Sequence, residues 1–203
     1  MLLILTLACG SAVQAYDQQS NESGQAFESF FSKKQQFDSE GIEIYSTNRQ
    51  LKQHKRFGFG TAIGGVGGVL GIHGEFNLDP MNALVLSVGT GPSYGTLGAL
   101  WKYNFESHYL SPYTKLGYSK WFSSGGTAGT ARDSDILRRI FSEKDLRAGK
   151  FDADFLASAV GAEYNQLEGE LSGVNFFGEV VLLTELKSST IIPTGSVGMT
   201  YFY

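Results

Sequence analysis

From Phe57 to the end of the chain, large apolar side chains recur at every second position. Alternate residues of a β-strand face opposite sides of a sheet, so this pattern predicts strands that each have one apolar face. The other face carries glycine, small polar and charged residues. The predicted strands are 57–64, 69–78, 83–90, 97–105, 112–122, 154–164, 174–184 and 193–203.

The lengths and connections of these strands favour a closed transmembrane barrel. Strands of roughly 8–11 residues suit a tilted β-strand that crosses a bilayer. Their number is even, and the longest connection, 123–152, follows the fifth strand. The connections after even-numbered strands are shorter, as in outer-membrane barrels, which have short periplasmic turns and longer outer loops. The prediction is an all-β fold: an eight-stranded antiparallel transmembrane β-barrel over 57–203, with 123–152 as a long extracellular loop.

The segment 16–56 differs from the barrel region because it is polar and rich in Gln, Ser, Lys and Glu. Phenylalanines at helical spacing predict an amphipathic helix over 24–38. A second short helix is predicted at 47–55, and another at 133–146 within the long loop. We expect a periplasmic, partly helical segment that covers the barrel mouth, rests on the inner leaflet or binds a partner.

Residues 1–15 resemble a secretory signal peptide. An apolar core is followed by small residues, with Val13 and Ala15 at the −3 and −1 positions of a cleavage site. The single cysteine, Cys9, lies inside this segment, and the preceding Leu7 and Ala8 resemble part of a lipoprotein box, although Thr6 replaces its usual leucine. Lipidation of Cys9 therefore stays open. Cleavage after Ala15 would leave a chain without cysteine.

The final strand carries a second signal. It resembles the C-terminal assembly signal of bacterial outer-membrane barrels. In that signal a polar residue is followed by a glycine two positions later, an aromatic three positions after the glycine and a terminal aromatic two positions further on. The matching residues here are Ser196, Gly198, Tyr201 and Tyr203. The region 57–203 thus resembles the small eight-stranded outer-membrane barrels of the OmpA/OmpX type. The resemblance implies insertion by the barrel assembly machinery, contact with outer-membrane lipid and lipopolysaccharide, and a periplasmic C-terminus.

Aromatic residues gather towards the ends of the predicted strands. Such positions form girdles at the two membrane interfaces of a barrel. The predicted interfacial aromatics, besides those of the final strand, are Phe76, Trp101, Tyr103, Phe105, Tyr118, Phe122 and Tyr164.

Charged residues share the inward-facing parity. An eight-stranded barrel has an interior filled by side chains rather than a pore, and charges buried there must be paired. The predicted lumen network consists of Glu75, Lys102, Lys115, Glu163, Glu179 and His73. Most simply this network is structural; a proton or metal site is the alternative.

Other chemistry finds little support. The glycine-rich stretch 58–68 lacks the context of a dinucleotide fingerprint and the Gly-Lys-Ser/Thr ending of a phosphate loop. A glycine-zipper helix is disfavoured because the two-residue alternation continues beyond it. With a net charge of −4, 26 glycines and 13% aromatics, the composition suits a barrel and gives no sign of nucleic-acid binding.

The three histidines, His54, His73 and His108, do not fall on the lipid-facing outer half where a lipid-modifying enzyme of this architecture would need its catalytic groups. We therefore expect no enzyme, no catalytic residue, no cofactor and no metal. The expected role is structural in the cell envelope, or surface contact through the extracellular loops. The alternatives are an outer-membrane lipid-modifying enzyme and a soluble lipocalin-like ligand-binding barrel.

Overall fold

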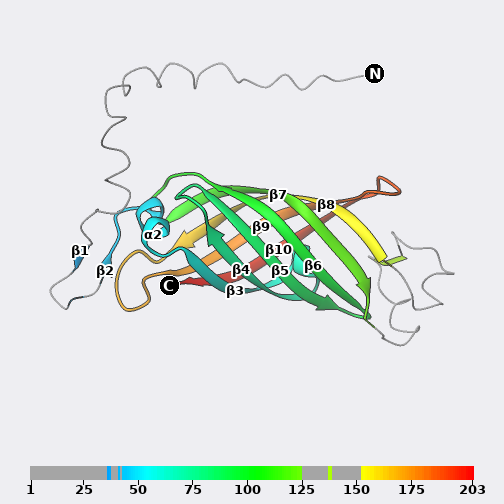
Figure 1. The fold of residues 1–203 in the computed structure, drawn as a ribbon, viewed down its shortest axis with the longest axis horizontal. Helices are drawn as coiled ribbons and strands as arrows, with labels where there is room; N and C mark the ends of the chain where they lie inside the picture. The colour runs from blue at the N-terminus through cyan, green and yellow to red at the C-terminus, as the bar shows by residue number, and fades with distance from the viewer. Residues whose placement is uncertain (1–35, 38–40, 42, 125–136, 139–151) are drawn as a thin grey trace, which may run out of the picture. The chain divides into compact units, whose positions relative to one another are not determined.

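A computed structural model describes residues 36–37, 41, 43–124, 137–138 and 152–203. Eight antiparallel strands close into a barrel in the order β10-β3-β4-β5-β6-β7-β8-β9, which Figure 1 shows from the side. The strands are β3 (Phe57–Gly64), β4 (Leu70–Asn77), β5 (Asn82–Gly91), β6 (Tyr94–Asn104), β7 (Leu110–Ser123), β8 (Asp152–Asn165), β9 (Val174–Glu185) and β10 (Ile191–Phe202). The predicted eight-stranded antiparallel barrel is confirmed.

The last strand pairs with the first and so closes the wall. The register between β10 and β3 runs from Ser196 opposite Gly64 to Phe202 opposite Gly58. At the end of this ladder the N–H of Tyr203 donates to the carbonyl oxygen of Phe57 at 2.9 Å. We call the rim that carries Phe57 and Tyr203 the near rim, and the opposite one, with the β9–β10 turn, the far rim.

The segment before the barrel contains three short elements. β1 (Gln36–Phe37) and β2 (Glu43–Ile44) form a two-stranded sheet, and α2 (Asn48–His54) follows. The helix predicted at 47–55 is confirmed: Thr47 caps it by accepting a hydrogen bond from the N–H of Gln50, and Lys55 follows its last residue.

Other predictions for the flanking segments are tested only in part. The helix predicted over 24–38 is wrong at its described end, because Gln36 and Phe37 pair as a strand with β2; the remainder lies outside the described residues. The predicted signal peptide 1–15 also lies outside them. Of the long loop 123–152, the structure describes 123–124, 137–138 and 152, so the helix predicted over 133–146 is described only at Leu137 and Arg138.

Side chains alternate across the wall as the sequence pattern predicts. On β10, Val197 and Met199 face outwards and are exposed, whereas Ser196, Thr200 and Phe202 face inwards and are buried. The same alternation on the other strands places an apolar surface on the outside of the barrel. This is the reverse of a soluble β-barrel, which buries its apolar face.

A short turn between β3 and β4 folds into the barrel. The 3-10 turn η1 (Gly65–Gly67) is entered and left through left-handed glycines, Gly64 at φ 85° and Gly68 at φ 74°. Side chains other than glycine rarely adopt this backbone conformation. Val66 at the centre of the turn is buried in an apolar cluster with residues of β5, β6 and β9. The turn therefore crosses the lumen instead of extending the wall.

The interior has two halves. Towards the far rim it is apolar and aromatic: the rings of Tyr94 and Trp121 stack with centroids 4.8 Å apart, and Phe155 packs against Trp121 at 5.2 Å. Towards the near rim it is charged. This charged half, together with α2, forms the candidate site.

Candidate functional site

The centre of the charged half is a lysine held between two carboxylates. Lys102 on β6 lies 2.8 Å from Glu75 of β4 and 2.5 Å from Glu163 of β8. All three side chains are buried. Their positions follow from strand parity, since each lies on an inward-facing register position near the same rim. The strands thus bring together three of the six residues predicted for the lumen network.

A second cation comes from outside the barrel wall. Lys52 of α2 reaches into the lumen, where its ammonium lies 2.5 Å from Glu163 and 3.4 Å from Glu75. It also donates a hydrogen bond to the side-chain oxygen of Asn104 at 2.9 Å. Burial lowers the pKa of Lys52, and the two carboxylates beside it act in the opposite direction. With Lys52 in place, two ammonium groups face two carboxylates, and the cluster is formally neutral.

Lys52 was not among the lumen residues predicted from the sequence. The signal that would have found it is a charge count: the predicted lumen residues include three glutamates, Glu75, Glu163 and Glu179, but only two lysines, Lys102 and Lys115. Buried charges need partners, so the surplus carboxylate points to a cation from another part of the chain.

The remaining predicted ions form a second pair. Lys115 of β7 lies 2.8 Å from Glu179 of β9, and the hydroxyl of Tyr113 donates to the same carboxylate at 2.8 Å. The Tyr113 ring has the ammonium of Lys102 4.6 Å from its centroid and that of Lys115 4.9 Å away. Cations over an aromatic face are attracted to its π-electrons. Tyr113 thereby connects the two clusters.

The three histidines do not gather at one site: one lies in the lumen and two lie outside it. His73 is buried in the lumen, where its Nε2 lies 2.8 Å from the hydroxyl oxygen of Thr200 and its ring meets Phe177 edge-on. His54 and His108 lie outside the lumen, each with its Nδ1 at a backbone oxygen, of Gln50 and of Ser46 respectively. Within the described ranges no three residues of the His, Cys, Asp and Glu types are grouped as metal ligands would be.

The lumen between the charged clusters and η1 is almost filled. A cavity of about 30 Å³ lies under the turn, lined by His73, Ser87, Lys115 and Glu179 among others. Its volume is comparable to that of one water molecule, whereas small-molecule sites occupy roughly 300–1,000 Å³. This cavity cannot hold an organic ligand.

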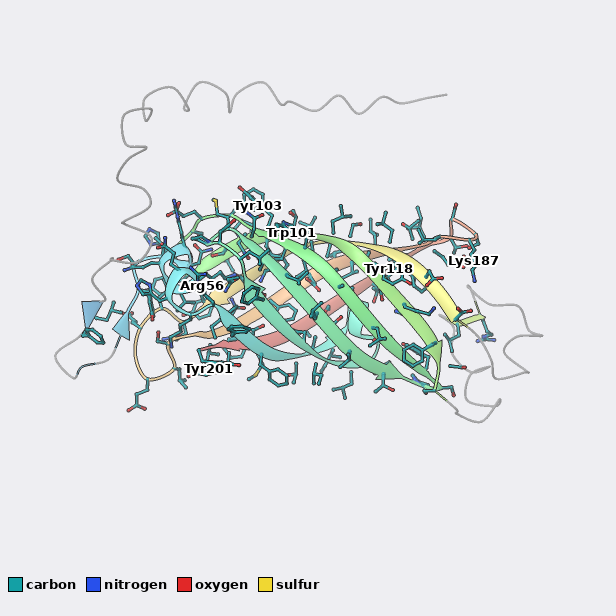
Figure 2. The ribbon with its side chains drawn as sticks, in the orientation of Figure 1. Arg56, Trp101, Tyr103, Tyr118, Lys187 and Tyr201 are labelled. Atoms are coloured by element: carbon teal, nitrogen blue, oxygen red, sulfur yellow. The ribbon has the colours of Figure 1, made fainter. Side chains whose placement is uncertain are left out.

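The outer surface carries the predicted interfacial aromatics. Figure 2 shows Trp101, Tyr103, Tyr118 and Tyr201 on the outside of the wall. At the near rim, Phe57 packs between Phe76, at 4.8 Å, and Tyr203, at 6.4 Å, measured between ring centroids. The other predicted aromatics also face outwards: Phe105 meets Tyr103 edge-on, Tyr164 stacks with Tyr109, and Phe122 covers Gly95.

Two of these outward aromatics have polar partners. The Trp101 ring nitrogen donates to the Asn82 side chain at 3.0 Å, and the Tyr118 hydroxyl donates to Asp154. Tyr118 lies towards the far rim, whereas Phe57, Phe76 and Tyr203 lie at the near rim. The aromatics therefore occupy both ends of the apolar surface, where membrane interfaces would lie.

The four residues that resemble an assembly signal lie on both faces of β10. Ser196 and Gly198 face the lumen, while Tyr201 and Tyr203 face outwards and are exposed. Gly198 also has a local structural reason: a Cβ there would lie 2.3 Å from the carbonyl oxygen of Thr61. This glycine is needed for close packing of β10 on β3, whatever its role in assembly.

Comparison with known proteins finds solved structures that match part of this chain. The chain matches no protein-family model, and no curated protein matches it. The N-terminal β-barrel domain of Pseudomonas aeruginosa OprF is 13% identical over 72% of this chain and 98% of that domain, with a TM-score of 0.47. The Yersinia pestis outer membrane protein Ail, determined in a phospholipid bilayer nanodisc, is 10% identical over 73% of this chain and 99% of Ail, with a TM-score of 0.40.

Proposed function

We propose that this protein is a non-catalytic integral barrel of a bacterial outer membrane, which supports the envelope or makes surface contacts through its outer loops. The observation that carries the proposal is the continuous surface of exposed apolar side chains around the barrel, from Ile63 on β3 to Val160 on β8 and Val197 on β10. Water-soluble proteins rarely expose a continuous apolar patch larger than a few hundred Å². A hydrocarbon environment removes this cost.

The proposed orientation has the near rim in the periplasm. It places α2 and the segment 16–56 on the periplasmic side and loop 123–152 outside the cell. It also puts the longer connection on the outer face, as is usual for such barrels. The barrel assembly machinery, outer-membrane lipid and lipopolysaccharide are the proposed partners.

Two alternatives are less well supported by the geometry. A lipocalin-like barrel needs an apolar interior that holds a ligand, whereas the near half of this lumen is charged and its cavity measures about 30 Å³. A lipid-modifying enzyme needs catalytic groups that reach the outer leaflet. His73, with its Thr200 partner, is instead buried inside the wall.

The proposal is tested by fractionation and by heat-modifiable migration. Expressed with its own leader in a Gram-negative host, the protein should be recovered with the outer membrane and should migrate differently in a detergent gel before and after boiling. A control variant, Gly198→Leu, forces a side chain against Thr61 and should abolish the unboiled form. Recovery of the unaltered protein in the soluble fraction without detergent would refute membrane insertion.

A further inference from the structure

The barrel wall has unequal height, and it is lowest at the β3–β4 turn. β3 and β4 contain eight residues each, whereas β7 and β8 contain fourteen. The ladder between β10 and β3 ends at Ser196 and Gly64, so residues 191–195 of β10 extend past it towards the far rim. Along this stretch β10 keeps its pairing with β9 but has no registered partner on the β3 side within the described chain.

A lateral hollow of about 200 Å³ occupies this low part of the wall. Its lining includes Ile63 and Val69, which face outwards and are 61% and 50% exposed, and Tyr94 and Trp121, which face inwards and are each 2% exposed. The hollow therefore joins the outer surface of the barrel to the aromatic half of its interior. The remaining lining residues are three glycines and Thr194, so none of the described residues that line it carries a charge.

The free edge beside the hollow is poorly suited to a peptide strand. The N–H of Phe202 points to the β9 side and that of Tyr203 to β3. Because N–H directions alternate along a strand and the register has no bulge, residue 193 points its backbone nitrogen to the open side. That residue is Pro193, which has no N–H to donate. Strand addition depends on such main-chain hydrogen bonds, so the sequence disfavours it here.

The position of the hollow along the barrel axis corresponds to the outer part of a membrane. An eight-residue strand rises about 26 Å along its axis and, at a tilt of about 40°, roughly 20 Å along the barrel. The apolar band of such barrels is about 25 Å tall. Measured from the near rim, the hollow therefore opens near the outer edge of the band.

We propose that the lateral hollow binds the end of one hydrocarbon chain of a membrane lipid, with the Tyr94 and Trp121 rings as its inner wall. This inference rests on the proposed membrane location. The apolar rim is continuous with the surface assigned to lipid, and the uncharged lining offers an alkyl chain burial without desolvating ions. A volume of 200 Å³ is about seven times that of a water molecule in the liquid, which suits a short run of methylene groups and not a whole lipid.

Fluorescence quenching tests whether a lipid chain enters the hollow, because the protein has two tryptophans, one on each side of the wall. A Trp101→Phe variant leaves Trp121 as the reporter of the hollow, and a Trp121→Phe variant leaves Trp101 as the reporter of the outer surface. Both are refolded into phosphatidylcholine bilayers whose acyl chains do or do not carry bromine, a contact quencher. We expect Trp121 to lose a fraction of its fluorescence comparable to that lost by Trp101.

A blocking variant separates entry of the chain from quenching through the wall. Both blocking variants are made in the Trp101→Phe background. Thr194→Phe fills the hollow and should abolish most of the Trp121 quenching. Thr194→Val, in which valine is close in size to the original threonine, should preserve that quenching. Val69→Phe narrows the exposed rim and gives the same test without changing an inward-facing residue. Folding of each variant is checked by heat-modifiable migration.

The outcomes distinguish the two proposals. Quenching of Trp101 without quenching of Trp121, or Trp121 quenching that neither blocking variant reduces, would overturn chain binding and leave the membrane location intact. If brominated chains quench neither tryptophan, the proposed membrane location fails as well.

Discussion

At the scale of single residues, Lys102 is the wall residue that holds the near half of the lumen together. Replacing it with methionine leaves Glu75 and Glu163 to share Lys52, so one buried carboxylate loses its partner. Breaking a buried ion pair from one side costs about 3–5 kcal/mol. We expect Lys102→Met to lower the free energy of unfolding by that amount, measured by urea titration of protein refolded in detergent.

The control for this variant is Lys187→Met, at an exposed lysine on the far rim, which should leave the midpoint unchanged. Adding Glu163→Gln to Lys102→Met should recover part of the lost stability, because one lysine then faces one carboxylate. A Lys102→Met variant as stable as the parent protein would show that the cluster is solvated.

The last two residues of the chain make a contrasting pair. Phe202 is fully buried in the lumen beside Lys52, whereas Tyr203 is exposed at the near rim. Phe202→Ala should reduce stability after refolding in detergent by about 3–5 kcal/mol, as large-to-small core changes do. If the resemblance to the assembly signal is meaningful, Tyr203→Ala should instead lower the amount inserted in cells, with little effect on refolding in detergent.

This pair is compared by quantifying the heat-modifiable form from cell envelopes and from refolding reactions in parallel. Equal, mild effects of the two substitutions in cells would indicate that the resemblance to the signal is accidental.

At the scale of elements, α2 is a seven-residue helix that depends on its docking. Isolated helices this short are unstable in water. Lys52→Met removes the ammonium that the lumen carboxylates require, so we expect faster hydrogen exchange over residues 45–55 while the strands keep their protection. Arg49→Met, which removes a half-exposed pair with Glu106, should change little.

A charge-matched double variant sharpens this test. Lys52→Met with Glu163→Gln leaves Lys102 opposite Glu75, and protection of α2 should partly return through its apolar contact, Leu51. If Lys52→Met leaves the exchange of α2 unchanged, apolar packing alone holds the helix.

The strands of the barrel could be predicted from the sequence, whereas the docking of α2 and the inward fold of η1 could not. Two-residue alternation predicted all eight strands and the face that each side chain takes, because it is set locally by the pleat of the strand. The helix at 47–55 was also predicted. Its docking was not, because the fit of Lys52 between Glu75 and Glu163 joins residues far apart in sequence. The inward fold of η1 was missed for the same reason: glycines at 64–68 permit many backbone conformations, and the packing of Val66 inside the barrel selects one.

At the scale of the whole molecule, the proposed orientation predicts opposite accessibility for the two rims. In a Cys9→Ala background, Lys187→Cys on the far rim should react with a membrane-impermeant maleimide in intact cells. Glu170→Cys, in the exposed β8–β9 turn of the near rim, should react only after the outer membrane is permeabilised. The reverse labelling pattern would invert the topology while leaving the barrel unchanged.

The connection between α2 and β3 consists of Lys55 and Arg56 alone. A tether this short holds Lys52 at the lumen mouth at an effective concentration of at least the millimolar order that short linkers provide. A free peptide with the sequence of α2, added at micromolar concentration, would therefore compete poorly for the same carboxylates. Any factor that frees the lumen mouth must act on this one chain, by weakening its contacts or cutting its tether, rather than by displacing it.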